Sequence, residues 1–263
     1  MPQTEAMRLK VPSRSLRQRF RPLVPVLLLV LGIALGLLWP TLHRSPLMLG
    51  QDAAYPGAQA RASWSEQSGG VIDIRPTTGR AATLLVLYPG GLVRPQAYQW
   101  LGTALAPAGV ETVIVRFPLD LAVTGVGRAD DVIARYAQGR PVVLAGHSLG
   151  GAMAAQYVSG NPGKVTGLIL MGAYPAGNVS LKGQTSLKVL SLLAEHDTVA
   201  KASDVRGGLT RLPASAKLVT IDGSVHAFFG RYGPQKGDGV PTVSRADAEA
   251  QIVRAVLTFL RDD

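Results

Sequence analysis

Ser148 lies in the stretch GHSLGG, residues 146–151, at a point where the sequence pattern changes. The apolar run VVLA (142–145) comes before it, and a helical pattern, LGGAMAAQYVSG (149–160), begins directly after it. A strand that runs straight into a helix forces the connecting residue into a cramped turn, which neighbouring glycines permit because they have no side chain. Serine in such a turn exposes its hydroxyl beside the first amides of the helix. The pattern predicts a nucleophilic Ser148; the alternative, a helix-capping serine, explains the glycines less well.

A serine hydroxyl becomes a good nucleophile only beside a base, and the base needs a carboxylate to orient it. In chains that place serine at a turn of this kind, an acid and then a histidine follow, each just beyond a strand. His226 follows the strand pattern AKLVTI (216–221) and is the predicted base. Asp197 is the predicted acid because it lies two residues further from the preceding strand than Glu195, the other candidate.

The other histidines are poorer candidates for the base, since the chain has only four. His43 flanks an apolar segment, His147 precedes Ser148 and is expected to point away from it, and His196 lies where the acid belongs. The chain has no cysteine, which excludes disulfides, thiolate metal sites and a cysteine nucleophile. We therefore expect no metal site and no cofactor.

Two backbone amides are needed to stabilise the oxyanion of a tetrahedral intermediate. The amide of Leu149, at the start of the helix, is one candidate. The other is expected in the loop LYPGGLV (87–93), where paired glycines allow close backbone approach. Gly91 is preferred and Leu92 is the second choice, while a plain turn is the alternative explanation for the glycine pair.

The elements that must position these groups alternate between strand and helix patterns from about residue 63 to the end. Most of the strand patterns are apolar on both faces, which indicates a mostly parallel sheet covered by helices on both sides, an α/β fold. Strands are expected at 71–74, 83–88, 110–117, 141–146, 166–171, 187–194 and 216–221, and helices at 95–108, 128–138, 149–160 and 245–262.

The first 62 residues have a different composition from the rest. Residues 1–21 carry six basic residues and one acidic residue, and residues 22–42 are apolar and uncharged. About 21 helical residues reach roughly 31 Å, the thickness of a bilayer's hydrocarbon core. We predict a basic cytoplasmic tail (1–21), a transmembrane anchor (22–42), a linker (43–62) and an extracytoplasmic catalytic domain (63–263) at the cell membrane. A cleaved secretory signal is the alternative.

The formal net charge of +10 does not by itself indicate nucleic-acid binding, because half of the excess lies in the short tail. The remaining charges are spread over the rest of the chain as on an ordinary soluble surface. The expected partners are a membrane, through residues 22–42, and a small-molecule substrate, with no nucleic acid. The oligomeric state is left open.

The chain resembles the α/β-hydrolase superfamily, and more narrowly its small "alpha/beta hydrolase fold-5" branch, over about residues 65–262. The resemblance rests on YPGGLVRPQAYQWLGTALAPAG, GHSLGGAMAA, the aspartate loop and GSVHAFFGRYGPQKGDG, in that order. It implies the α/β-hydrolase fold, with Ser148, Asp197 and His226 as a catalytic triad and the amides of Leu149 and Gly91 as the oxyanion hole. One departure is AEHD, where the family commonly has a glycine shortly before the aspartate.

A serine hydrolase that cleaves carboxylic esters through an acyl-enzyme is the function that these residues favour. One triad also serves thioesters and acyl transfer, and a non-catalytic binding or scaffold module is the alternative from another class. Residues 172–186 are too few for a large cap. The loop after His226 is therefore expected to line the entrance with Tyr232, Lys236 and Asp238, although a solvated connector explains this loop equally well.

Overall fold

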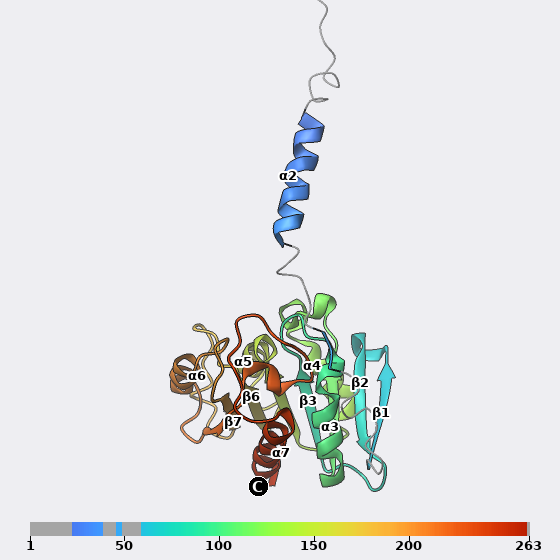
Figure 1. Cartoon of the computed structure of the whole chain (residues 1–263). Coiled ribbons are helices and arrows are strands. Elements are labelled where there is room, and N and C mark those ends of the chain that lie inside the picture. The colour runs from blue at the N-terminus through green and yellow to red at the C-terminus, as the bar shows by residue number, and fades with distance from the viewer. Residues whose placement is uncertain (1–22, 39–45, 49–58, 262–263) are drawn as a thin grey trace, which may run out of the picture. The chain divides into compact units, whose positions relative to one another are not determined.

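The chain divides into two units, Met1–His43 and Arg44–Asp263 (Figure 1). The computed structural model describes residues 23–38, 46–48 and 59–261. In the first unit, α2 (Leu23–Leu38) has no charged residue, and its side chains from Pro25 to Gly36 are exposed. None of the helices in the described ranges has both the length and the apolar character that crossing a bilayer needs. The expected anchor extends past α2 at both ends, and the basic tail lies outside the described residues.

The second unit is built on one eight-stranded sheet with the strand order β1-β2-β4-β3-β5-β6-β7-β8 (Figure 1). Strand β1 pairs with β2, and β2 with β4, in antiparallel fashion; all other neighbours are parallel. The mostly parallel sheet expected from the sequence is therefore present. Its strands are β1 (Ala60–Ser65), β2 (Val71–Pro76), β3 (Thr83–Tyr88), β4 (Val110–Val115), β5 (Val142–His147), β6 (Gly167–Met171), β7 (Lys188–Ala194) and β8 (Lys217–Ile221).

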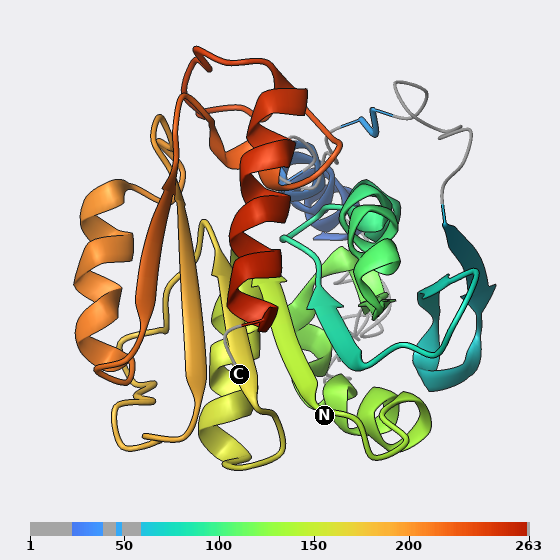
Figure 2. The ribbon, with the colours of Figure 1, turned by 90° about the horizontal axis from the view of Figure 1, so that it is seen from below.

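Helices cover both faces of the sheet, and each face has its own apolar core (Figure 2). Successive side chains of a strand point to opposite faces, so Val86 of β3 joins the core under α4 and α5, while Leu85 and Leu87 join the core under α3 and α7. This two-sided burial is why the central strands are apolar throughout. The helices of this unit are α3 (Gln99–Leu105), α4 (Arg128–Tyr136), α5 (Leu149–Gly160), α6 (Ala202–Gly208) and α7 (Arg245–Arg261).

Two elements, β1 and α6, were not expected from the sequence. Strand β1 is an edge strand with polar, mostly exposed side chains, so it lacks the apolar run that marks the buried strands. It begins at Ala60, inside the segment expected to be a linker. Residues 46–48 of that segment also contact the domain, because the amide of Met48 donates to the carbonyl of Arg231 at 3.0 Å. The domain therefore begins earlier than residue 63.

The carboxyl ends of the parallel strands lie along one edge of the sheet, and the loops that leave them meet there. Strands β3, β5, β7 and β8 lead into the loops that carry Gly91, Ser148, Asp197 and His226. Residues 172–187, between β6 and β7, contain no helix, so no helical cap is inserted at this point.

Candidate active site

Ser148 occupies a strained turn between β5 and α5. Its φ and ψ angles are 52° and −124°, a backbone conformation that costs a residue with a side chain roughly 1–3 kcal/mol. The turn is also tight, because a β-carbon at Gly146 would come within 2.5 Å of the carbonyl oxygen of Gly150. Glycine is therefore required at 146 for packing, and the turn holds Ser148 partly exposed at the edge of the sheet.

The turn is anchored to the neighbouring strand. The amide of Ser148 donates to the carbonyl of Met171, the last residue of β6, at 3.0 Å. The next residue, Gly172, lies against the acid and the base, since a β-carbon there would be 3.0 Å from His226 Nδ1 and 3.1 Å from Asp197 Oδ2. The end of β6 thus brings Ser148 and the other two predicted residues into one neighbourhood.

Asp197 and His226 form a buried hydrogen-bonded pair. His226 Nδ1 lies 2.7 Å from Asp197 Oδ2, and both side chains are almost fully buried. An ionised carboxylate can only accept hydrogen bonds, so the hydrogen is on Nδ1 and the Nε2 lone pair of a neutral ring is left available. Nε2 is buried and has no hydrogen-bond partner among the described residues. The contact with Asp197 therefore fixes the orientation of the ring and leaves Nε2 without a partner in the described structure.

The acid is held by the loop that carries it. Asp197 Oδ1 accepts hydrogen bonds from the amides of Val199 and Ala200, at 2.9 and 2.7 Å. These bonds use the oxygen that His226 does not contact, so both carboxylate oxygens are satisfied. Glu195 points elsewhere: its side chain is half exposed and accepts a hydrogen bond from the amide of Gly223 at 2.7 Å.

The loop after β3 brings Gly91 against the start of α5. A β-carbon on Gly91 would lie 3.1 Å from Leu149 Cδ2 and 3.5 Å from Leu149 Cβ, so Gly91 packs against the Leu149 side chain. The amide of Leu92 already donates to the carbonyl of Asp120 at 2.8 Å. The amides of Gly91 and Leu149 have no such partner among the described residues, which favours Gly91 over Leu92 as the second oxyanion donor.

Comparison with known proteins identifies the family. The sequence model of the alpha/beta hydrolase family matches residues 84–250, which span β3 to α7. The chain belongs to the alpha/beta hydrolase family. It is therefore a hydrolase of a general kind, and the turn at Ser148 is the one in which this fold places its nucleophile.

A solved structure supports the same fold. The hydrolase is similar to a protein described as a "predicted CIB-like hydrolase" from Thermoplasma acidophilum, with a TM-score of 0.56 and 17% sequence identity. The match covers 78% of this chain and 99% of the other. No curated protein matches this hydrolase in sequence.

His147 lies beside the predicted base, a contact that the sequence did not indicate. Its ring centroid is 4.5 Å from that of His226, and its Nδ1 is 2.8 Å from the hydroxyl of Tyr98. Burial, together with the charge of His226, lowers the pKa of His147 well below its ordinary value. The sequence did not indicate these contacts because the partners of His147 come from distant parts of the chain.

Asp238 has a structural role that the sequence did not reveal. Its carboxylate accepts hydrogen bonds from the amides of His226 and Ala227, at 3.1 and 2.8 Å. It thereby holds the turn that carries the base. An aspartate before glycine is a signal for side-chain bonding to a nearby backbone, but nothing in the sequence indicates a partner twelve residues away.

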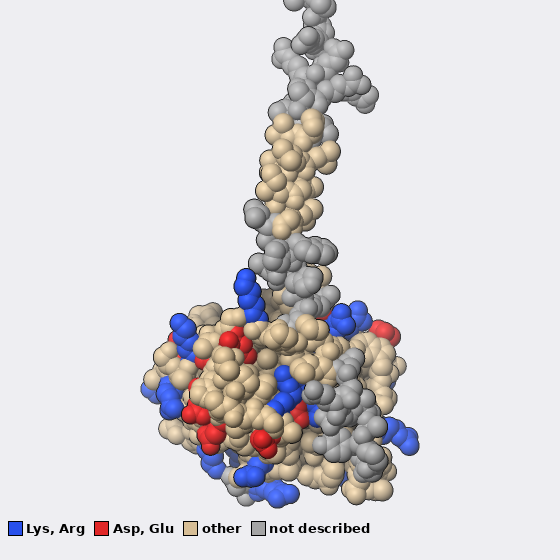
Figure 3. Space-filling view, in the orientation of Figure 1, with Lys and Arg blue, Asp and Glu red and all other residues tan. Residues whose placement is uncertain are grey.

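The entrance loop is less open than expected. Tyr232 is only 1% exposed, and its hydroxyl donates to Gln235 Oε1 at 2.7 Å, so it packs inside the loop and does not line a rim. Lys236 lies in the same loop and is exposed. On the face of the domain shown in Figure 3, acidic and basic side chains are interspersed.

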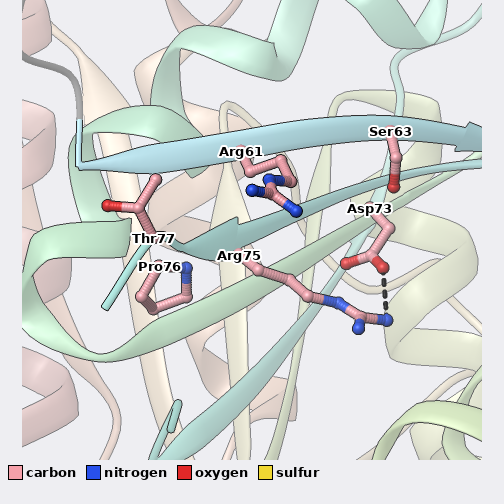
Figure 4. Close-up of a pocket in the computed structure, with 6 residues that line it drawn as sticks. All are labelled: Arg61, Ser63, Asp73, Arg75, Pro76 and Thr77. Carbon is pink, nitrogen blue, oxygen red and sulfur yellow. Dashed lines mark ion pairs between the residues drawn. The ribbon is translucent and has the colours of Figure 1, made fainter. Parts of the chain in front are cut away.

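A second cluster of charged groups lies on β1 and β2 (Figure 4) and on the neighbouring β4. In the strand order, these strands are at the other end of the sheet from β7, which leads to Asp197. Here a cavity of about 440 Å³ is lined partly by Arg61, Asp73 and Arg75. Arg75 pairs with Asp73 at 2.5 Å and with Glu111 at 3.1 Å. Asp73 Oδ1 has no hydrogen-bond partner in the described structure, and burial raises the pKa of Asp73 to about 6. No group of three or more potential metal ligands occurs in the described part of the chain.

Proposed function

We propose that this hydrolase cleaves carboxylic esters through an acyl-enzyme intermediate. Ser148 Oγ attacks the ester carbonyl while His226 Nε2 takes its proton, and the C–O bond then breaks as the imidazolium protonates the leaving alcohol. Water attacks the acyl-enzyme in the same way and regenerates the serine. Asp197 holds the imidazole and stabilises its charged form, and the amides of Leu149 and Gly91 bind the oxyanion.

One observation carries this proposal: the His226 ring is bound to Asp197 through Nδ1, while its Nε2 is buried and has no hydrogen-bond partner among the described residues. A buried polar atom without a partner costs free energy, and a group such as the Ser148 hydroxyl offsets that cost if it engages Nε2 during reaction. The Nε2 atom of His147 is also unpartnered, but the other nitrogen of His147 bonds a phenol, whereas that of His226 bonds a carboxylate, as the base of a triad requires.

A fluorophosphonate probe, which labels activated serines, tests the assignment. We expect labelling of the wild type, none for Ser148→Ala, and a large loss for His226→Ala. Ser159→Ala, in the exposed turn at the end of α5, is the matched control and should label as the wild type does. Wild type that is not labelled and does not hydrolyse p-nitrophenyl esters would favour the non-catalytic scaffold, and equal labelling of Ser148→Ala would reject the nucleophile.

The substrate is expected to be a small or loosely specified ester. Residues 172–187 hold no helical cap, so substrate access depends on short loops. A series of p-nitrophenyl esters and matched thioesters of graded chain length tests this class. Preference for the thioesters, or transfer of the acyl group to an added alcohol in place of hydrolysis, would indicate one of the other reactions that the same triad performs.

We further propose that residues 22–42 anchor the hydrolase in the cell membrane, with the N-terminus in the cytoplasm. The apolar, uncharged α2, its exposed side chains and the basic residues before it support an anchor. The test is extraction of membranes with alkaline carbonate, which removes peripheral proteins. Full-length chain retained in the membrane supports the anchor, whereas a shorter soluble chain that lacks the N-terminal segment would indicate a cleaved signal.

A further inference from the structure

A buried tyrosine links the loop of the expected oxyanion hole to the histidine before the nucleophile. Tyr98 is fully buried, and its hydroxyl accepts a hydrogen bond from the amide of Gly90 at 2.9 Å. The same hydroxyl lies 2.8 Å from His147 Nδ1. Gly90 fits closely into this arrangement, because a β-carbon there would lie 2.8 Å from His147 Nδ1 and 3.0 Å from the Tyr98 oxygen.

The positions of the hydrogens follow from these contacts. A neutral phenol has one hydrogen, and since the Gly90 amide already donates to the Tyr98 oxygen, that hydrogen points to His147 Nδ1. Nδ1 is therefore the acceptor, and the neutral ring of His147 has its hydrogen on Nε2. Burial raises the pKa of Tyr98 and lowers that of His147, so both stay uncharged near neutral pH.

The other side of His147 faces the base. Its ring lies 4.5 Å from the His226 ring, and Phe229 and Tyr232 pack around it at centroid distances of 5.5 and 6.1 Å. The main chain of His226 lies close to His147 and raises the His147 pKa, which partly offsets the effect of burial. Nε2 of His147 nevertheless has no hydrogen-bond partner in the described structure. His147 therefore contacts the base loop by packing and the oxyanion loop through Tyr98.

We propose that Tyr98 and His147 are positioning residues that hold the Gly90–Gly91 loop and the His226 ring in the relative placement that ester cleavage needs. This inference rests on the proposed function and adds two residues to it. Neither residue is proposed to touch the substrate.

Displacement of the Gly90–Gly91 loop or of the His226 ring is expected to slow the chemical step more than it weakens substrate binding. An oxyanion donor must lie about 2.7–3.1 Å from the position that the oxygen reaches in the transition state. Misplacement by about 1 Å can cost on the order of a hundredfold in rate. A neutral His147 also suits a site in which His226 becomes an imidazolium, since two charged rings this close would repel each other.

The first test is Tyr98→Phe, which removes the hydroxyl but keeps the ring. We expect kcat for a p-nitrophenyl ester to fall on the order of tenfold to a hundredfold while KM changes less than about threefold. Fluorophosphonate labelling of Ser148 should slow similarly. The matched control is Tyr157→Phe: Tyr157 is also fully buried, and its hydroxyl donates to Asp130 Oδ1 at 2.7 Å. That control should lose stability but keep kcat.

A second test asks whether the two residues act as a unit. His147→Phe removes the nitrogen that accepts from Tyr98, and the double variant with Tyr98→Phe should lose about as much kcat as either single variant. The acid limb of the kcat/KM profile should keep its midpoint in Tyr98→Phe, because His147 acts by placement and does not exchange protons. If Tyr98→Phe does not fold, His147→Gln, which removes the same acceptor, is measured in its place.

Several results would overturn the inference. These are a kcat for Tyr98→Phe close to that of the wild type or no lower than that of Tyr157→Phe, independent losses in the double variant, or a shifted acid limb. A wild type with neither labelling nor turnover would instead contradict the proposed function, so the two failures are distinguishable.

Discussion

Two aspartates of this hydrolase are nearly equally buried but are bound very differently. Asp197 is 6% exposed and Asp73 is 4% exposed. Asp197 accepts two hydrogen bonds from backbone amides and pairs with His226, so both of its oxygens are used. Asp73 pairs with Arg75 through one oxygen, while the other has no partner in the described structure.

The difference comes from where each residue lies in the sheet. Asp197 follows the end of β7, where the loop amides have no ladder partners and can turn toward a carboxylate. Asp73 lies inside β2, whose backbone is paired with β1 on one side and β4 on the other. Its carboxylate therefore depends on side chains, and burial raises its pKa to about 6 despite Arg75. Burial alone does not decide what a carboxylate can do.

The largest expected effect is a difference in kcat/KM between variants of the two aspartates. Asp197→Asn should lower kcat/KM by about a thousandfold to ten-thousandfold, because an amide cannot hold the His226 tautomer that leaves Nε2 unprotonated. Asp73→Asn should leave kcat/KM nearly unchanged, since Asp73 lies at the other end of the strand order. Steady-state ester hydrolysis measures both, with thermal unfolding as the check on folding. Similar losses of kcat/KM in the two variants would mean that the different bonding of the two carboxylates does not correspond to different roles in catalysis.

The next effect concerns the pH dependence of stability. The pKa of Asp73 is raised from 3.8 to about 6 in the folded chain, so the folded state holds its proton more tightly than the unfolded state does. Its contribution to stability is complete below about pH 4 and is lost as pH rises through about 6, by at most about 3 kcal/mol.

Urea unfolding at about pH 4.5 and 7.5 tests this sign. The free energy of unfolding of wild type, relative to that of Asp73→Asn, should decrease from the lower pH to the higher pH. The variant serves as the reference because it has no carboxyl to ionise at this position. A difference that rises with pH would mean that Arg75 stabilises the charged form more than burial disfavours it.

A smaller effect is expected at Asp238, whose loop holds the turn that carries His226. Asp238→Ala leaves the amides of His226 and Ala227 without their acceptor, which should cost about 1–3 kcal/mol of stability. The turn that carries the base is then less well held, so kcat should fall as well. Asp238→Asn keeps one acceptor oxygen and should lose less in both measurements, and equal losses would contradict a role for the second oxygen.

The smallest effect is expected at Thr112, which is paired in register with Ile74, next to Asp73. Thr112 Oγ1 is buried without a partner in the described structure. Thr112→Val removes this polar atom at nearly constant shape and should change the free energy of unfolding by no more than about 1 kcal/mol, in the stabilising direction. A loss of 2 kcal/mol or more, measured by urea unfolding, would indicate a partner for the hydroxyl.

Much of the fold could be predicted from the sequence because the central strands and their helices carry strong local patterns. Strand 83–88 and helix 149–160 were predicted with the bounds that the structure shows. Strand β1 was missed because an edge strand with exposed, polar side chains has no apolar run to mark it. The anchor proposed for residues 22–42 stays a prediction.

For the candidate site, too, some features could be predicted from the sequence and others could not. Ser148 was predicted because its turn needs glycines close to it in the chain, and His226 and Asp197 because each follows a recognisable strand; the structure brings the acid and the base together. The contacts of Asp238 and Tyr98 were not predicted, because each residue forms a hydrogen bond with a segment that comes close only after folding. The contact between His147 and His226 was not predicted for the same reason.

By itself the sequence determined which residues can carry the chemistry and on which element each one lies, because glycine spacing and apolar periodicity act over a few neighbouring residues. The tertiary structure alone decided what surrounds each of them. It left His226 Nε2 unpartnered, bound Asp197 on both oxygens, left one oxygen of Asp73 unpaired and packed His147 against the base. These outcomes depend on contacts between segments far apart in the chain, and no local pattern encodes them.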